Sequence, residues 1–372
     1  MASKFRLFTK RFLIIIYITV AVVFLLACLA AYLDPREWWF ISLLGLVFPF
    51  LLLVIIFFLF FWTILRSRLA FISIFVLIIG WRNISILFAF NSPGEFNYTK
   101  QPDVIRIVTW NVARFIELKR NNNKGSQTRL KMLELLKQQD ADILCLQEFH
   151  HSDDTMYYAN LQYMKEKLNY PYFYFSRDDD GYLHYFGSAI FSRLPIIDSG
   201  LIRFPRPSLP EALIYADIKF KNDTFRVYNT HLQSLQFKQG DYDKLNKIKN
   251  PDDRILDNSR NILAKMKIAI KFRSIQSDLV KQITGDSPYP YMLCADLNDI
   301  PNSYTYSTIR GNLQDAFLKK GFGIGRTFDA LSPTLRIDYI FATKQFTILQ
   351  FNRLVKNYSD HYMLLSDVKL NK

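Results

Sequence analysis

Two long uncharged segments near the N-terminus place the strongest constraint on how this 372-residue chain folds. Residues 12–33 and 38–65 contain no charged side chain, and each is long enough to cross a bilayer as a helix. Inside lipid a segment must satisfy its own backbone hydrogen bonds, so each is expected to be helical. A third apolar segment, residues 69–90, is interrupted by Arg82. We predict that residues 1–90 form a membrane anchor with three transmembrane helices.

The positive charges that flank these segments predict a multi-pass protein of the cell membrane and its orientation. Four basic residues precede the first segment, and Arg66 and Arg68 lie between the second and third. Positively charged loops remain in the cytoplasm, so three spans would place the chain after residue 91 outside it. If the third segment does not cross, that part faces the cytoplasm. A lipoprotein signal is the alternative for the first segment, because residues 25–28 resemble a cleavage box ending at Cys28.

A different pattern begins after the turn-rich linker at residues 91–102. From residue 103 to 372, short apolar runs alternate with amphipathic helical segments, and some of the runs follow one another in pairs. This mixture favours an α/β domain built as a layered sandwich of mixed sheets. The predicted strands cover residues 104–110, 143–147, 187–192, 212–220, 224–230, 291–295, 336–342 and 362–370, and the predicted helices cover residues 128–139, 157–167 and 258–283.

Polar side chains stand at or next to the ends of most of these strands. The run 291–295, for example, leads directly into Asp296. A carboxylate within an apolar strand, as at Asp338, requires a partner, because burying it unpaired costs several kcal/mol. His361 would be such a partner. Each residue alone has an ordinary structural explanation, but their order makes coincidence improbable. The set comprises Asn111, Glu148, His231, Asp296, Asn298, Asp338, Asp360 and His361.

The composition of this polar set excludes several kinds of active site. The chain has no Gly-x-Ser-x-Gly motif, no glycine-rich phosphate loop, no His-Glu-x-x-His motif and no cysteine cluster. Carboxylate and amide oxygens suit a hard cation, so we predict Mg²⁺ or Mn²⁺ as the cofactor. Such an ion would polarise a phosphoryl oxygen, while a carboxylate orients or deprotonates water.

Six stretches in this order resemble the endonuclease/exonuclease/phosphatase superfamily, which includes DNase I-like nucleases, apurinic endonucleases, sphingomyelinases and inositol-polyphosphate phosphatases. The resemblance implies a four-layer α/β sandwich, in which two mixed sheets are flanked by helices. It also implies metal-dependent phosphoester hydrolysis by direct water attack, without a covalent intermediate. The chain is identified as a membrane-anchored, bacterial-type member. The stretches are residues 109–112, 142–148, 229–232, 295–298, 336–340 and 359–361.

The resemblance further implies a role for each member of the polar set. Glu148 is the main expected metal ligand, and Asp296 is expected to orient or activate the attacking water. His361 is expected to act on the phosphate while Asp338 holds its ring. Carried onto this chain, the expected metal ligands are Asn111, Glu148 and Asp360, and the expected catalytic residues are Asp296, Asn298, His231, His361 and Asp338.

At two positions the sequence differs from the pattern of some members of the family, and these differences bear on the number of metal ions and on the type of nuclease. Ala113 stands where some nucleases of this family carry Asp, which puts a second metal ion in doubt. The tyrosine-bearing signature of apurinic endonucleases is not evident, because the matching strand leads to His231 instead. This difference and the membrane anchor argue against a role in base excision.

Net charge is the remaining guide to the substrate. The chain carries +14, and because residues 1–99 account for +5, residues 100–372 carry +9. A basic domain suits a polyanionic substrate or an anionic membrane surface. We favour nucleic acid slightly, with a phospholipid headgroup such as that of sphingomyelin as the alternative. A catalytically inactive, membrane-tethered binding domain is the alternative of another class. The lysine-rich residues 236–260 are either a solvated surface loop, the interpretation we favour, or contacts for substrate phosphates. The aromatic-rich residues 172–185 either contact bases or lipid or belong to the core and sheet edge.

Overall fold

The fold is that of a computed structural model, which describes residues 2–92, 94–121, 124–205, 211–235, 255–330 and 332–371. Most of the predicted lysine-rich segment lies outside these residues. Contacts divide the chain into two compact units. The first contains the described residues within 1–87, 235–274 and 300–307, and the second contains those within 88–234, 275–299 and 308–372. Helix α8 (Ile255–Gly285) contributes to both units.

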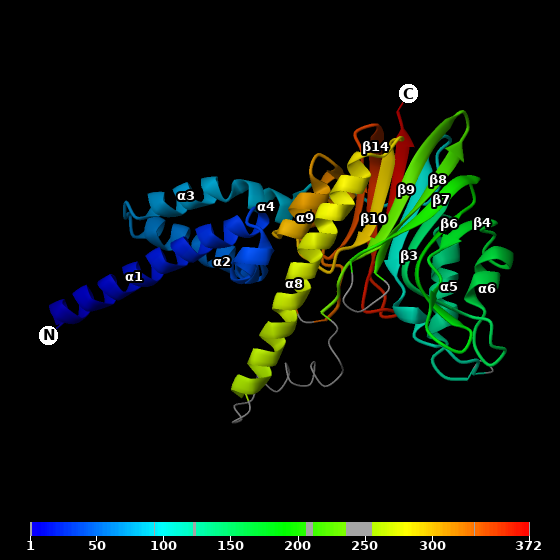
Figure 1. The fold of residues 1–372 in the computed structure, drawn as a ribbon. Helices are drawn as coiled ribbons and strands as arrows, with labels where there is room; N and C mark the ends of the chain where they lie inside the picture. The colour runs from blue at the N-terminus through cyan, green and yellow to red at the C-terminus, as the bar shows by residue number, and fades with distance from the viewer. Residues whose placement is uncertain are drawn as a thin grey trace. The chain divides into compact units, whose positions relative to one another are not determined.

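The first unit is built around apolar helices (Figure 1). Two segments, Phe5–Ala31 and Pro35–Ile64, are long and apolar enough to cross a membrane. They meet at a fully buried Tyr17, whose ring packs on Phe58 and whose hydroxyl lies 2.7 Å from the Ser73 hydroxyl. The helices of this unit are α1 (Ala2–Cys28), the short η1 (Leu29–Ala31), α2 (Pro35–Ile64), α3 (Ala70–Ile79) and α4 (Trp81–Leu87).

The third predicted span is not a straight helix. Helices α3 and α4 meet at Gly80 and are bent by 67° relative to each other, so the pair is a third span only if it crosses as one broken element. Asn83, which interrupts the apolar pattern, is buried and donates hydrogen bonds to the Cys28 carbonyl and to Asn302. Asn302 in turn donates to the Ala27 carbonyl at 3.0 Å. The polar side chain therefore joins the end of α1 to residues 300–307 within this unit.

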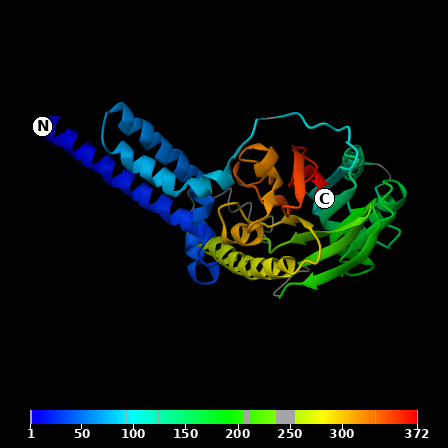
Figure 2. The same ribbon diagram turned by 90° about the horizontal axis from the view of Figure 1, so that it is seen from above.

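The second unit contains two large mixed sheets (Figures 1 and 2). The six-stranded sheet has the order β11 (Gln314–Asp315), β13 (Asp338–Ala342), β10 (Tyr291–Asp296), β9 (Asp223–His231), β8 (Ala212–Phe220) and β7 (Ile196–Arg203). The seven-stranded sheet has the order β14 (Phe346–Leu354), β15 (Met363–Leu370), β2 (Ile105–Asn111), β3 (Ile143–Ser152), β6 (His184–Ser192) and β4 (Tyr172–Phe175), with β5 (Asp178–Asp179) also on β6. A small separate sheet pairs β1 (Ala89–Phe90) with β12 (Phe322–Gly323).

The two large sheets pack face to face. One apolar core joins side chains such as Ile107 and Cys145 of the seven-stranded sheet to Val227 and Cys294 of the six-stranded sheet. A second core covers the other face of the seven-stranded sheet with helices α5 (Thr128–Gln138) and α6 (Asn160–Glu166). The shorter elements are η2 (Ala113–Phe115), α9 (Tyr304–Arg310) and α10 (Ala316–Lys320). The predicted class, mixed sheets flanked by helices and preceded by apolar helices, is confirmed.

Several elements differ from the sequence prediction. Strand β3 does not stop at Gln147 but continues through Glu148 to Ser152, with an irregular register at Glu148. Asp338 begins β13 instead of lying within it, because the residues before it form a loop. The aromatic-rich segment contributes β4 and the start of β6. Strands β7 and β14 were also not predicted, since their polar residues interrupt the apolar alternation.

Candidate active site

The end of strand β10 lies at the centre of the polar set. Strand β9 pairs with β10 in parallel, which places His231 level with Asp296. Strand β13 pairs with β10 antiparallel on the other side, which places Asp338 level with Asp296. The register of three neighbouring strands thus brings together residues that are far apart in the sequence. The Asp296 carboxylate at their centre is fully buried.

The opposite sheet supplies Asn111 and Glu148 to the same site. The Asn111 side-chain amide donates to an Asp296 carboxylate oxygen at 2.9 Å and to a Glu148 carboxylate oxygen at 3.3 Å. His231 Nε2 lies 3.6 Å from the same oxygen of Asp296 and 3.9 Å from that of Glu148. The site therefore spans both sheets, and Asn111 links the two carboxylates.

Glu148 reaches the site because β3 is irregular at this residue. The backbone of Glu148 has a φ of 51°, and the register with β6 shifts between Leu146 and Phe149. Phe149 then pairs with Gly187, which has a φ of 148°. A Cβ atom at Gly187 would lie 1.9 Å from the Ser176 hydroxyl, so a larger residue forces that hydroxyl away from its hydrogen bonds with the Ser188 amide and Asp178.

Gly187→Ala is expected to lower the free energy of unfolding of the full chain by roughly 2–3 kcal/mol, since it adds both backbone strain and a steric clash. Gly181 is a matched control, because its φ is also positive, at 84°, yet nothing lies within 4 Å of a Cβ there. Gly181→Ala should cost only about 1 kcal/mol. Denaturant unfolding of both variants in detergent measures the difference, and equal losses would show that the close approach at Gly187 is unimportant.

A buried hydrogen-bond network beneath the site joins the two sheets. Gln147 on β3 donates to the Thr109 hydroxyl at 2.9 Å and to Asn229 on β9 at 2.7 Å. Asn229 donates to the carbonyls of Leu146 and Ala189. These buried side chains precede Glu148 and His231, so they fix the positions of both. Neither Gln147 nor Asn229 was predicted to belong to the site, although both lie within matching motifs.

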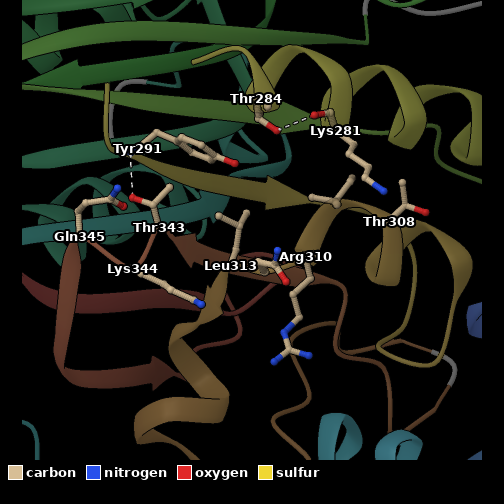
Figure 3. A pocket seen from close by; sticks show the side chains of 13 residues that line it. Lys281, Thr284, Tyr291, Thr308, Arg310, Leu313, Thr343, Lys344 and Gln345 are labelled. Atoms are coloured by element: carbon tan, nitrogen blue, oxygen red, sulfur yellow. Dashed lines mark hydrogen bonds between the residues drawn. The ribbon is translucent and has the colours of Figure 1, made fainter. Parts of the chain in front are cut away.

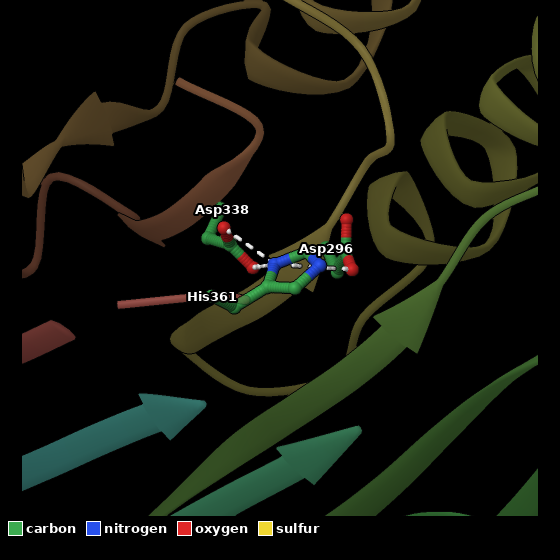
Figure 4. Close-up of side chains that lie close together, drawn as sticks. All are labelled: Asp296, Asp338 and His361. Atoms are coloured by element: carbon green, nitrogen blue, oxygen red, sulfur yellow. Dashed lines mark hydrogen bonds and ion pairs between the residues drawn. The ribbon is translucent and has the colours of Figure 1, made fainter. Parts of the chain in front are cut away.

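His361 and Asp338 form a buried pair beside Asp296 (Figure 4). His361 Nδ1 lies 3.0 Å from each carboxylate oxygen of Asp338 and 3.7 Å from an oxygen of Asp296. Burial alone would lower the pKa of His361, but the Asp338 and Asp296 carboxylates raise it to about 10. Burial raises the pKa of Asp338 to about 6 against the opposing effect of His361. At neutral pH the ring is therefore an imidazolium held by a carboxylate.

Two hydroxyl residues that sequence reasoning missed hold this pair in place. The Thr327 hydroxyl accepts hydrogen bonds from the backbone amides of Ile337 and Asp338, at 2.9 and 3.0 Å. The Ser359 hydroxyl donates to the Asn111 carbonyl and accepts from the His361 amide. Ser359 lies inside a matching motif, whereas no sequence signal distinguishes Thr327.

Two predicted site residues are less closely joined to this cluster. Asn298 has a φ of 51°, and its backbone amide donates to an Asp296 carboxylate oxygen at 2.9 Å. Its side-chain amide donates instead to the Leu232 carbonyl. The Asp360 side chain is exposed, and among the described residues it accepts a hydrogen bond only from Ser359. Its negative charge nevertheless contributes to the raised pKa of His361.

Residues 108–361 match the sequence profile of the Endonuclease/Exonuclease/phosphatase family. The chain belongs to this family. Its members hydrolyse phosphoesters and generally depend on a divalent metal, so a hydrolase role follows. Residues 10–87 match a separate domain of unknown function. No curated protein sequence gives a significant match.

Solved structures of this family share the fold. The human nocturnin catalytic domain is 21% identical, with a TM-score of 0.51 over 72% of this chain and 94% of that one. A humanized D. rerio TDP2 is 18% identical, with a TM-score of 0.50 over 72% and 99%. A family protein from Bacteroides thetaiotaomicron is 17% identical, with a TM-score of 0.50 over 73% and 100%. At these low identities, the structural similarity establishes a common fold and nothing further.

The donor set fits the divalent cation that the family generally uses. The polar set contains four carboxylates and two histidines. It therefore carries an excess of two negative charges even with two positively charged rings. The carboxylates are those of Glu148, Asp296, Asp338 and Asp360. Ligand atoms of Asp296, Asp338 and His361 lie within 4.8 Å of one another. This trio is the weaker cation site, because the His361 imidazolium already offsets one of its two carboxylate charges. Glu148 is the better ligand, since its side chain is 29% exposed and so accessible to a hydrated ion.

Proposed function

We propose that this protein is a metal-dependent phosphoesterase that hydrolyses a phosphodiester or phosphomonoester by direct attack of water. The main support for the proposal is that side chains of both sheets contact one another at Asp296. There the Asn111 amide donates hydrogen bonds to Asp296 and to Glu148. A structural role would not require two carboxylates and a histidine within 3.9 Å in the interior of the domain. Burying these charged groups lowers the free energy of unfolding, and a membrane-tethered binding domain without activity would gain nothing from it.

Each residue then has a task that follows from its surroundings. Glu148, with Asn111 and Asp360, would hold Mg²⁺ or Mn²⁺. When bound, the ion supplies charge neutralisation at the phosphoryl oxygens. Asp296 accepts a proton from the attacking water, and its carboxylate is aimed by the amide of Asn298.

The two histidines act on the phosphate. The His361 imidazolium, held by Asp338, donates a hydrogen bond to a phosphoryl oxygen and stabilises the charge that grows there. His231 lies level with Asp296 on β9 and contacts the phosphate from the other side. The Asn298 side chain would leave the Leu232 carbonyl to bind the scissile group.

Nucleic acid is the favoured substrate because of the positive charge of residues 100–372. A phospholipid or sphingomyelin headgroup is the second candidate, and the two long apolar helices favour it by placing the chain at a bilayer. A panel of DNA, RNA, sphingomyelin, phospholipid and inositol phosphates, given to the full chain with Mg²⁺, separates these cases. Hydrolysis of DNA or RNA at least tenfold faster than of the lipids is expected. Faster lipid hydrolysis would identify the lipid headgroup as the substrate. Hydrolysis of none of these compounds would contradict the proposal.

We also propose that residues 103–372 form the catalytic domain and lie outside the cytoplasm. A C-terminal alkaline phosphatase fusion is expected to be active, whereas a C-terminal fluorescent protein should remain dark. Deleting residues 69–90 removes the bent third segment and should reverse both signals. A fluorescent fusion of the full chain would place the domain in the cytoplasm and contradict the orientation.

A further inference from the structure

A cavity in the second unit lies away from the site described above. It has a volume of about 600 Å³ and is lined by residues of α8, α9, the start of β10 and the turn after β13 (Figure 3). Tyr291 at this cavity begins the strand that ends at Asp296 in the active site. Five residues of strand separate them by roughly 16 Å. The cavity is therefore not an extension of the active site.

Three cations line the cavity, and they come from three separate elements (Figure 3). Lys281 belongs to α8, Arg310 to α9, and Lys344 to the turn between β13 and β14. Among the described residues, no acidic side chain lines the cavity. Lys281 and Lys344 alone contribute two positive charges, and the C-terminal ends of α8 and α9 offset about half a charge each, which leaves about +1. An anion is the ligand that this charge favours.

The cavity wall is rigid and partly apolar. The Thr343 amide donates to the Tyr291 carbonyl at 3.0 Å, and the Tyr291 amide donates to the Thr343 hydroxyl. Gln314 donates to the carbonyls of Thr343 and Phe346, which fixes the turn that carries Lys344. The Tyr291 ring and the Leu313 side chain add apolar surface. A preformed wall of this kind binds a ligand without first having to be ordered.

From these features we propose that the cavity binds a phosphate monoester attached to an apolar or aromatic group. Lys281 and Lys344 would contact the phosphate, and Tyr291 and Leu313 would contact the apolar part. Two sources share this chemistry, a soluble nucleotide and the phosphate headgroup of a lipid. The proposal stands on different residues from those of the hydrolytic site and goes beyond the proposed reaction.

Calorimetric titration of the full chain in detergent and chelator tests this site without requiring hydrolysis. The probes are AMP and dihexanoyl phosphatidic acid, with adenosine and dihexanoyl glycerol as controls that lack the phosphate. Saturable binding of at least one phosphate probe is expected, at least tenfold tighter than its control. Tighter binding of AMP indicates a nucleotide ligand, and tighter binding of the phosphatidic acid indicates a headgroup. Absence of saturable binding by both overturns the proposal.

Substitutions assign the binding to the cavity. Lys281→Glu combined with Lys344→Glu is expected to raise the Kd at least tenfold. Reversing two exposed lysines on α5, Lys131 and Lys137, makes the same change in charge elsewhere and should raise the Kd less than twofold. Asp296→Asn should leave the Kd unchanged. Equal effects of the two lysine pairs, or loss of binding only in Asp296→Asn, would overturn the proposal, and the midpoint of thermal unfolding verifies that each variant is folded.

Discussion

Asp296→Asn is expected to slow phosphodiester hydrolysis by about 10³-fold or more, equivalent to roughly 4 kcal/mol of transition-state stabilisation. An amide of the same shape cannot accept the proton of the attacking water. It also removes the charge that His361 and His231 face at 3.7 and 3.6 Å. Because the loss is in the chemical step, kcat should fall while KM changes little. Steady-state kinetics of the full chain measures both parameters.

A matched substitution separates this effect from a general loss of charge. Asp223 is exposed and begins β9, the strand whose other end carries His231. Asp223→Asn should retain kcat within a factor of two. A loss in Asp296→Asn no greater than in Asp223→Asn would remove Asp296 from the reaction.

Replacing His361 with Ala is the second substitution with a large expected effect, a loss of about 10²–10⁴-fold in kcat/KM. The reason is that the buried imidazolium faces two carboxylates at once, Asp338 at 3.0 Å and Asp296 at 3.7 Å. Asp338→Asn should lower kcat/KM by a smaller factor, because the His361 ring remains but loses its charge and its orientation. Kinetics of each variant at several substrate concentrations gives the loss.

The double variant tests whether the two residues act as one unit. If Asp338 acts only by holding His361, then the double variant should be no slower than His361→Ala alone. Losses that multiply would show that Asp338 has an independent task. Near-normal activity of His361→Ala would exclude the ring from the mechanism.

The order of strands and polar residues was predictable because each motif is local. The run 212–220 is β8 with the same bounds, and Asn111, His231 and Asp296 each close a strand as expected. Such predictions depend only on apolar periodicity and on where it stops. Their convergence on one site was predicted from the family resemblance, since the partners lie far apart in the chain, by 185 positions for Asn111 and Asp296.

The features that escaped prediction depend on tertiary contacts. Glu148 could not be recognised as an irregular point within β3, because its backbone conformation is set by the pairing with β6 and the space at Gly187. Thr327 gives no signal, since its role arises only where its loop meets the start of β13. Arg82 was taken as the interruption of the third span, and only the packing shows the bend at Gly80 and the contact of Asn83 with Asn302.

The site around Asp296 and Glu148 is proposed to hydrolyse a phosphodiester with a divalent metal. The most direct test is the hydrolysis rate of the full chain with Mg²⁺, after chelation, and after Mg²⁺ is restored. The rate should fall at least 100-fold on chelation and return on restoration. Glu148→Gln should need at least tenfold more Mg²⁺ for half-maximal rate, whereas Glu166→Gln, exposed on α6, should behave as wild type. A rate unchanged in excess chelator would contradict the account.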